Sequence, residues 1–169
     1  IVTPANFAVA EADSYSANGV GNSQTPAVYL GIYEDMEGKT ATLKSVSFRR
    51  EGGNDFGASI SVLWTANVYV STAAKTGAAP SATFAENHGP DKTQVAAGAF
   101  VLVPATEYSG PVSPFDYTIP FNQHFSWTGG GPLCIEIQMA SKSPTGQTVY
   151  LDYVSRALQT NPPVVYRKT

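Results

Sequence analysis

The feature that most constrains the fold is an alternation of apolar and polar side chains over residues 59–71, SISVLWTANVYVS. Successive side chains of a β-strand point to opposite faces, so strict alternation indicates a strand that is buried on one side. We therefore expect a long antiparallel strand with one face in the core. The expected core face carries Ile60, Val62, Trp64, Ala66, Val68 and Val70, and the expected outer face carries Ser59, Ser61, Thr65, Asn67 and Ser71.

Further runs repeat this pattern and are separated by clusters of Gly, Pro, Asn, Asp and Ser, which are typical of turns. The clearer runs are residues 42–50, 115–121, 132–139 and 148–154, and the weaker ones are residues 27–33, 98–104 and 164–168. About eight short strands without a convincing helix indicate an all-β fold, and we expect a single antiparallel β-sandwich of jelly-roll type. Residues 1–20 are expected to form an extended N-terminal arm, and residues 21–169 the sandwich domain.

The same pattern assigns side chains to faces in two of these strands. In residues 115–121 we expect Phe115, Tyr117, Ile119 and Phe121 to point into the core. In residues 132–139 we expect Leu133, Ile135, Ile137 and Met139 to point inward, and Cys134, Glu136 and Gln138 to point outward.

Composition narrows the choice of partners. Charged residues make up 14% of the chain, below the ~25% of typical soluble domains, and the formal net charge is −3 without a run of Lys or Arg. Such a chain would not neutralise a nucleic-acid backbone or an anionic membrane surface. No stretch approaches the ~20 apolar residues of a membrane span. We expect neither nucleic-acid binding nor membrane insertion, and no cofactor.

The beginning of the chain favours export from the cell. The first residue is Ile1 rather than Met, and the first seven residues, IVTPANF, do not look like a signal peptide, so we infer that a leader has been removed. We expect a secreted protein, extracellular or at the cell surface. Cys134 is the single cysteine, which excludes an internal disulfide, and LCIEI around it is a plain strand pattern without an evident base.

Several blocks of the sequence match a known pattern. They are SVSFRR at residues 45–50, ANVYVST at 66–72, TFAENHGPDKTQVAAG at 83–98 and FDYTIPFNQHFSWTGGGPLCIEI at 115–137. Together they resemble a domain of secreted bacterial proteins that often carry PEP-CTERM sorting tails. The resemblance implies a jelly-roll-like sandwich without an established enzymatic role. The chain ends in NPPVVYRKT rather than in a hydrophobic sorting helix with a basic tail, which favours a released or self-assembling protein.

The block at residues 83–95, TFAENHGPDKTQV, admits two interpretations. Glu86, His88 and Asp91 have the side chains of a metal site, although neighbouring residues offer few further ligands. The alternative is a shaped turn, and the resemblance implies this one because the His88 position varies in the family. In that turn Phe84 can fill the core, Asn87 and Gly89 tolerate positive φ, and the Asp91 carboxylate can accept backbone N–H bonds in the turn that follows.

Two other groups of acidic residues deserve comparison with known sites. Glu34, Asp35 and Glu37 lie close together and could offer oxygen ligands to calcium, but the spacing is not that of a dedicated calcium loop. Glu136 and Asp152 are expected to point outward from successive strands, as the paired carboxylates of sandwich-fold glycosidases do. Outward acids on strands are also ordinary solubilising residues, and no Gly-x-Ser-x-Gly motif or Ser/His pairing is evident, so we expect no enzyme.

Aromatic residues offer an alternative function. A flat exposed ring can stack on a sugar while amide and carboxylate groups bond its hydroxyls. The candidates are Trp127 with Tyr108, Asn122, Gln123 and His124. The competing interpretation is that Phe125 and Trp127 close one end of the sandwich.

The sequence favours an extracellular structural or assembly subunit, as in a surface layer, matrix or filament. The N-terminal arm would pair with the open sheet edge of a neighbouring copy, forming a homo-oligomer or polymer. Its apolar residues Ile1, Val2, Phe7 and Val9 would contact the neighbour. The alternative is a carbohydrate-binding module with Trp127 as its platform.

Overall fold

A computed structural model of the chain describes residues 14–16, 26–49, 61–103, 112, 114–115, 117–145, 151–153 and 164–167. These residues form strands and two short 3-10 helices, η3 (Glu34–Met36) and η4 (Phe84–Asn87). The predicted all-β class is confirmed. No helix among the described residues is both long and apolar enough to cross a membrane.

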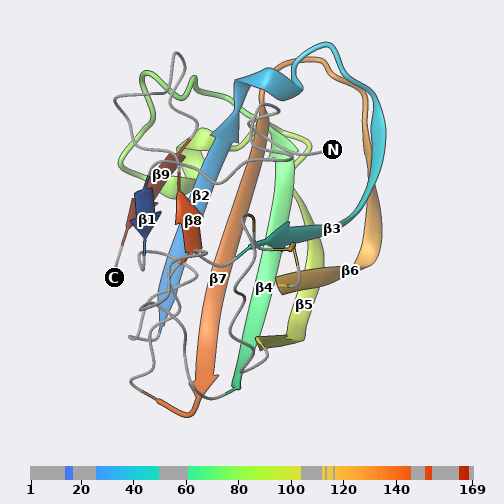
Figure 1. Cartoon of the computed structure of the whole chain (residues 1–169). Coiled ribbons are helices and arrows are strands. Elements are labelled where there is room, and N and C mark those ends of the chain that lie inside the picture. Colours follow the sequence, from blue (N-terminus) through green and yellow to red (C-terminus); the bar gives the residue numbers. More distant parts are fainter. Residues whose placement is uncertain are drawn as a thin grey trace.

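The larger layer is a five-stranded sheet in the order β5-β4-β7-β2-β9 (Figure 1). Its neighbouring strands are antiparallel throughout. The strands are β2 (Ala27–Tyr33), β4 (Val62–Thr72), β5 (Thr93–Val103), β7 (Leu133–Ser143) and β9 (Val164–Arg167).

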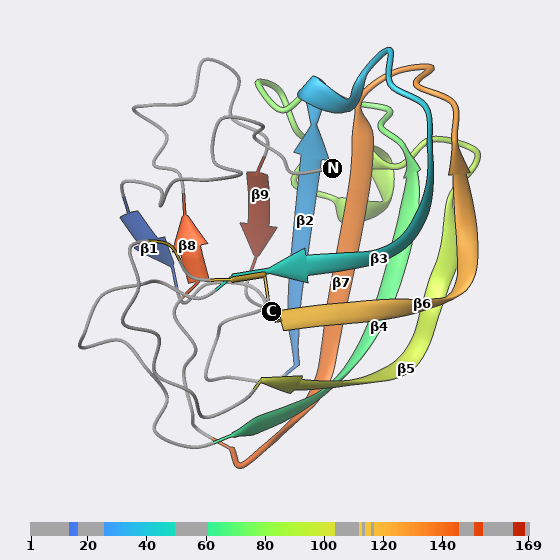
Figure 2. The same cartoon turned by 45° about the vertical axis from the view of Figure 1, so that its right-hand side comes forward.

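A second layer lies across one face of this sheet. It consists of β3 (Ala41–Phe48) and β6 (Tyr117–Trp127), which pair antiparallel and cross in front of β4 and β7 in Figure 2. A third, small sheet joins β1 (Ser14–Ser16) to β8 (Leu151–Tyr153). Part of the predicted arm is thus paired within its own chain, and the rest of residues 1–20 lies outside the described residues.

The core between the two layers confirms the alternation of buried and outward side chains that was predicted for β4. On β4, Val62, Trp64, Ala66, Val68 and Val70 are all buried. They pack in one cluster with inward side chains of β6 and β7, including Tyr117, Ile119, Ile137 and Met139. Ile60 lies outside the described residues.

One prediction of a core side chain is wrong, and two correctly predicted outward side chains are more buried than the pattern suggested. Phe115 lies before β6, is 39% exposed, and has the Arg49 guanidinium 5.1 Å from its ring centroid instead of core neighbours. On β7, Cys134 and Glu136 are buried although they point away from the core. The reason is that the segment after β4 crosses this outer face and covers them.

The strand β5 begins earlier than its sequence suggested, at Thr93 rather than near Gly98. Its register with β4 shifts twice, between Ala66 and Val68 and between Val68 and Tyr69. Such β-bulges place successive residues out of alternation. Residues 96–99, AAGA, are all small, and the two bulges interrupt the alternation. For both reasons the sequence of β5 does not show a clear period of two.

Candidate functional site

The segment that covers the outer face of the sheet is residues 73–92, which we call the cover segment. It follows β4, contains η4, and runs into β5. Ala73 and Phe84 pack on a small apolar cluster formed by Leu30, Ile32 and Cys134. The prediction that Phe84 fills a core is therefore confirmed, but this core is a second one, on the outer side of the sheet.

Asn87 organises the turn of the cover segment with its side-chain amide. Its Oδ1 accepts the Ser81 N–H at 2.8 Å, and its Nδ2 donates to the carbonyl oxygens of Ser81 and Thr83 at 3.0 and 3.2 Å. Asn87 is fully buried. Among the described residues positive φ occurs only at glycines other than Gly89, so the turn does not use the tolerance of Asn87 and Gly89 for positive φ.

Gly89 is required because the backbone of β4 lies very close to it, and not because of its own φ angle. Its N–H donates to the Thr72 carbonyl oxygen at 2.7 Å. A Cβ atom at Gly89 would lie 2.7 Å from the same oxygen. The cover segment can therefore lie this close to β4 only with glycine at that position.

The Asp91 carboxylate fixes the end of the cover segment to β4. Its two oxygens each accept the Thr72 N–H at 3.0 Å, and Oδ2 also accepts the Thr72 hydroxyl at 2.8 Å. The sequence correctly predicted that Asp91 accepts a backbone N–H. The donor comes from the preceding strand rather than from the following turn.

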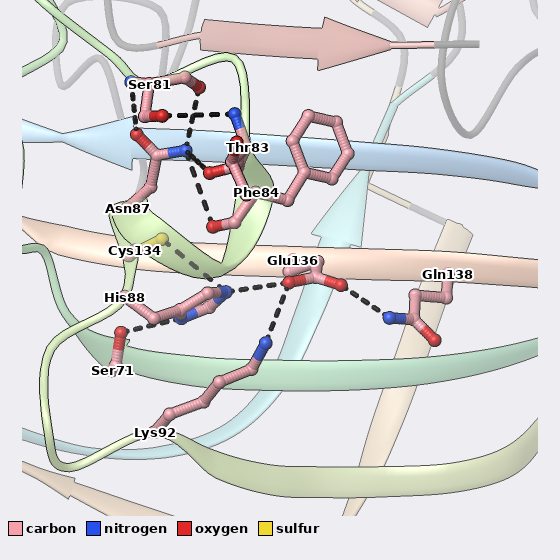
Figure 3. A network of polar contacts seen from close by, with 10 residues as sticks. All are labelled: Ser71, Ser81, Thr83, Phe84, Asn87, His88, Lys92, Cys134, Glu136 and Gln138. Atoms are coloured by element: carbon pink, nitrogen blue, oxygen red, sulfur yellow. Dashed lines mark hydrogen bonds and ion pairs between the residues drawn. The ribbon is translucent and has the colours of Figure 1, made fainter. Parts of the chain in front are cut away.

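At the centre of the site His88 connects two strands (Figure 3). Its Nδ1 is 2.7 Å from the Ser71 hydroxyl on β4, and its Nε2 is 2.8 Å from Glu136 Oε2 on β7. His88 is buried beneath the cover segment, with the Cys134 sulfur 3.9 Å from Nε2. The family resemblance implies a variable loop position for His88, so the sequence does not predict this role.

Glu136 is the acceptor at which three side chains meet. His88 and Lys92 contact its Oε2, Lys92 at 3.0 Å, and Gln138 Nε2 donates to its Oε1. Burial raises the pKa of the Glu136 carboxyl, but hydrogen bonds from His88, Gln138 and Lys92 outweigh burial and lower it to about 2. The carboxylate is ionised and accepts only, so Nε2 of His88 carries a proton. In a neutral His88, Nδ1 then accepts the Ser71 O–H.

This arrangement of Ser71, His88 and Glu136 has the bonding order of a serine nucleophile, a base and an orienting acid. The burial of these three side chains argues against that chemistry. Ser71 is 0% exposed, and the other two are buried. Cys134 is no better placed. Burial first, and then the negative charge of Glu136, raise the pKa of its thiol to about 12, so the reactive thiolate is disfavoured.

The predicted metal ligands do not converge. Glu86 Oε2 accepts the Ser81 hydroxyl at 2.6 Å, while His88 and Asp91 bind β7 and β4 as described above. Of the second acidic group, Glu34 Oε1 accepts the Gly77 N–H at 2.9 Å, and Asp35 and Glu37 are exposed. Within the described ranges, no group of three or more His, Cys, Asp or Glu side chains is placed to hold a metal ion.

The expected carboxylate pair is also not formed as predicted. Glu136 is 3% exposed and engaged in its own network. Asp152 belongs to β8, which pairs with β1 in a different sheet from β7. The prediction that Glu136 and Asp152 form a carboxylate pair on one sheet face is therefore wrong.

Trp127 is not a platform for a sugar. It is 3% exposed, its Nε1 donates to the Met36 carbonyl oxygen at 3.2 Å, and its ring stacks near Phe125. The competing interpretation, closure of the sandwich, fits this burial. Asn122, Gln123 and His124 are exposed on β6, and Asn122 Oδ1 accepts the Ala97 N–H at 3.1 Å. Tyr108, Ile1, Val2, Phe7 and Val9 lie outside the described residues.

Sequence reasoning missed Ser71, Lys92 and Gln138 as members of the network. One signal was available, because Ser71, Cys134 and Glu136 all occupy outer-face positions of long strands next to the polar block at 83–95. What the sequence did not reveal is that this block folds back over that face. Comparisons with protein-family models, with curated proteins and with solved structures find no match for the chain.

Proposed function

We propose that the chain is a non-catalytic β-sandwich that serves as an extracellular structural or assembly subunit of a surface layer, matrix or filament. The observation that carries the proposal is an open sheet edge. Among the described strands, β3 pairs only with β6, so its other edge offers backbone N–H and C=O groups to a further strand. A strand from a second copy satisfies these groups by β-sheet augmentation.

The buried network supports a structural role rather than a chemical one. The side chains of Ser71, His88 and Glu136 bond to one another inside the protein and join β4, the cover segment and β7. A buried polar network of this kind rigidifies a fold when its members are satisfied. A rigid subunit loses little conformational entropy when it assembles with other copies.

The finer parts of the proposal rest on the sequence. We take the sandwich to be of jelly-roll type, and the resemblance of residues 83–98 to PEP-CTERM-associated domains favours secretion. The N-terminal arm is proposed as the added strand. Since β1 within it pairs with β8 of the same chain, the residues before Ser14 are those that would reach a neighbour.

The test is the mass of the native chain in solution by light scattering, with negative-stain electron microscopy of the same sample. We expect ordered assemblies far above the 17.8 kDa chain mass. Deleting residues 1–13, which keeps β1 in place, should leave folded monomers. A second variant with Ile1, Val2, Phe7 and Val9 all changed to Ser keeps the backbone of the arm and shows whether its side chains matter.

The outcomes separate the parts of the proposal. A native chain that is monomeric at all concentrations would overturn the assembly role. Assembly that survives the deletion would keep the role but remove the arm from it, leaving β3 and the other sheet edges as the contacts.

A further inference from the structure

Next to the His88 network, a group of polar side chains gathers on the outer face of the five-stranded sheet. We call it the polar patch; its members are Asn67 and Tyr69 of β4, Gln94 of β5, Gln138 of β7, and Lys92 just before β5. The strand register places them together, because Tyr69 is opposite both Gln94 and Glu136, and Asn67 is opposite Gln138. Directly opposed side chains lie about 5 Å apart at Cβ.

Most of the patch is held in place by bonds to the protein. Asn67 Oδ1 accepts the Gly98 N–H at 2.8 Å, and Gln138 donates to Glu136. Lys92 Nζ contacts Glu136 and lies 4.6 Å from the Tyr69 ring centroid. Side chains that are already ordered lose little conformational entropy when a ligand binds, so this patch is preorganised.

The patch also keeps the groups that a ligand would need. Asn67 uses only its Oδ1 in the bonds described, which leaves its NH2 as a donor, and Gln138 keeps its carbonyl oxygen as an acceptor. Gln94 is exposed, and the side chain of Lys92 is 32% exposed. The partly buried Tyr69, whose ring has Lys92 Nζ over one face, adds an aromatic side chain and a hydroxyl.

From these features we infer that the polar patch binds a neutral polysaccharide. Sugar hydroxyls both donate and accept, as carboxamides do, and aromatic side chains suit the apolar faces of pyranose rings. The charge of Lys92 is balanced by Glu136, which disfavours strong selection for an anionic chain. This binding is separate from the proposed assembly, since it uses a different surface.

A protein partner fits this surface less well. Protein interfaces have an apolar or aromatic centre and bury about 800 Å² on each side. The large apolar side chains that are exposed among the described residues are Leu63 and Phe115, and neither belongs to the patch. The formal net charge of −3 likewise disfavours nucleic acid.

The experiment is native gel electrophoresis of the full chain in gels that contain a soluble neutral polysaccharide: mixed-linkage β-glucan, xylan, galactomannan or dextran. We expect slower migration in at least one of these gels than in a plain gel. Tyr69→Ala and Gln94→Ala should each weaken the affinity about threefold to tenfold, the range that one aromatic or polar contact contributes.

A matched control is available on the other sheet. Gln123 is an exposed glutamine of β6, so Gln123→Ala removes the same side chain away from the patch and should leave migration in the sugar gels unchanged. Circular dichroism and the thermal midpoint establish that each variant is folded. If Tyr69→Ala does not fold, Gln94→Ala decides, because Gln94 is exposed.

Three results would overturn the inference. One is unaltered migration of the native chain in all four gels. Another is loss of retardation in Gln123→Ala but not in Gln94→Ala, which would place the site on β6. The third is retardation only by an acidic polysaccharide such as alginate, which would contradict a neutral ligand.

Discussion

At the scale of single residues, Glu136 shows how position in the fold decides the behaviour of a side chain. The residue is an acid at an outer-face position of a strand, where acids are usually solvated. Here the cover segment buries it, and His88, Lys92 and Gln138 supply the hydrogen bonds that an ionised carboxylate needs. Burial without these donors would have favoured the neutral acid.

The low pKa of Glu136 predicts how the stability of the protein depends on pH. The folded-state pKa of about 2 lies below the ordinary value of 4.5, so between these values the unfolded chain binds more protons than the folded one. The stability contributed by Glu136 is therefore complete above pH 4.5 and is lost as the pH falls toward 2. In Glu136→Gln, the free energy of unfolding should be lower at neutral pH and should fall less steeply across this window.

Urea unfolding at a series of pH values measures both effects. Glu37→Gln is the control, because Glu37 is exposed after η3, and its pH profile should follow that of the native chain. If the profile of Glu136→Gln were as steep as that of the native chain, Glu136 would not be the group that titrates.

The sequence could identify these residues but not their surroundings. The inward residues of β4 and β7 were predicted because alternation is a local pattern. The partners of His88 lie 17 positions before it and 48 positions after it in the chain. No local pattern encodes contacts at that separation, so the network could not be predicted from one sequence.

At the scale of elements, the cover segment adds a second packed region on the outer face of the five-stranded sheet. A loop over a sheet buries backbone groups, which must find partners. The Gly89 N–H donates to the Thr72 carbonyl oxygen, the Ala74 N–H donates to the Asn87 carbonyl oxygen, and the Asp91 carboxylate accepts the Thr72 N–H. The segment is thus attached to the end of β4 at several points.

Gly89→Ala tests this attachment. The added Cβ would lie 2.7 Å from the Thr72 carbonyl oxygen, a backbone atom that cannot move without disturbing β4. We expect a loss of about 1–3 kcal/mol in the free energy of unfolding, as for other overpacked sites. Gly130→Ala is the matched control, because a Cβ there meets no atom within 4 Å, and it should change stability by less than about 0.5 kcal/mol.

Chemical denaturation of both variants gives the comparison, and hydrogen exchange of the Thr72 amide reports on the segment itself. Faster exchange in Gly89→Ala alone is the expected result. Equal stability of the two variants would mean that the cover segment can shift away from β4 at little cost.

At the scale of the whole molecule, aromatic rings join the two layers. Trp64 of β4 meets Tyr117 of β6 edge to face at 4.8 Å between ring centroids. Tyr117 contacts Phe48 of β3 at 5.7 Å, and Phe48 contacts Tyr29 of β2 at 6.0 Å. Such contacts add to the hydrophobic stabilisation of the core. The alternating pattern predicted the inward rings of Trp64 and Tyr117, but the sheet order β5-β4-β7-β2-β9 depends on pairings between distant strands and could not be read from it.

The hydroxyl of Tyr117 is a buried polar group in this apolar core, and it leads to a prediction about the stability of the protein. It is buried without a hydrogen-bond partner among the described residues, and burial raises the pKa of Tyr117 well above its usual value. A buried hydroxyl without a partner loses its bonds to water and gains none. Tyr117→Phe keeps the ring and removes that cost, so we expect the free energy of unfolding to stay the same or to rise.

Tyr33→Phe is the matched comparison, because the Tyr33 hydroxyl is also buried but bonds the Tyr29 hydroxyl at 2.9 Å. Its loss should lower the free energy of unfolding by about 1 kcal/mol, the net worth of one hydrogen bond. Urea unfolding of the two variants beside the native chain measures the difference. A loss in Tyr117→Phe as large as that in Tyr33→Phe would show that the Tyr117 hydroxyl is satisfied in solution, with a bound molecule or a water between the layers. If Tyr117→Phe is instead at least as stable as the native chain, ring packing across the two sheets alone holds Tyr117 in the core.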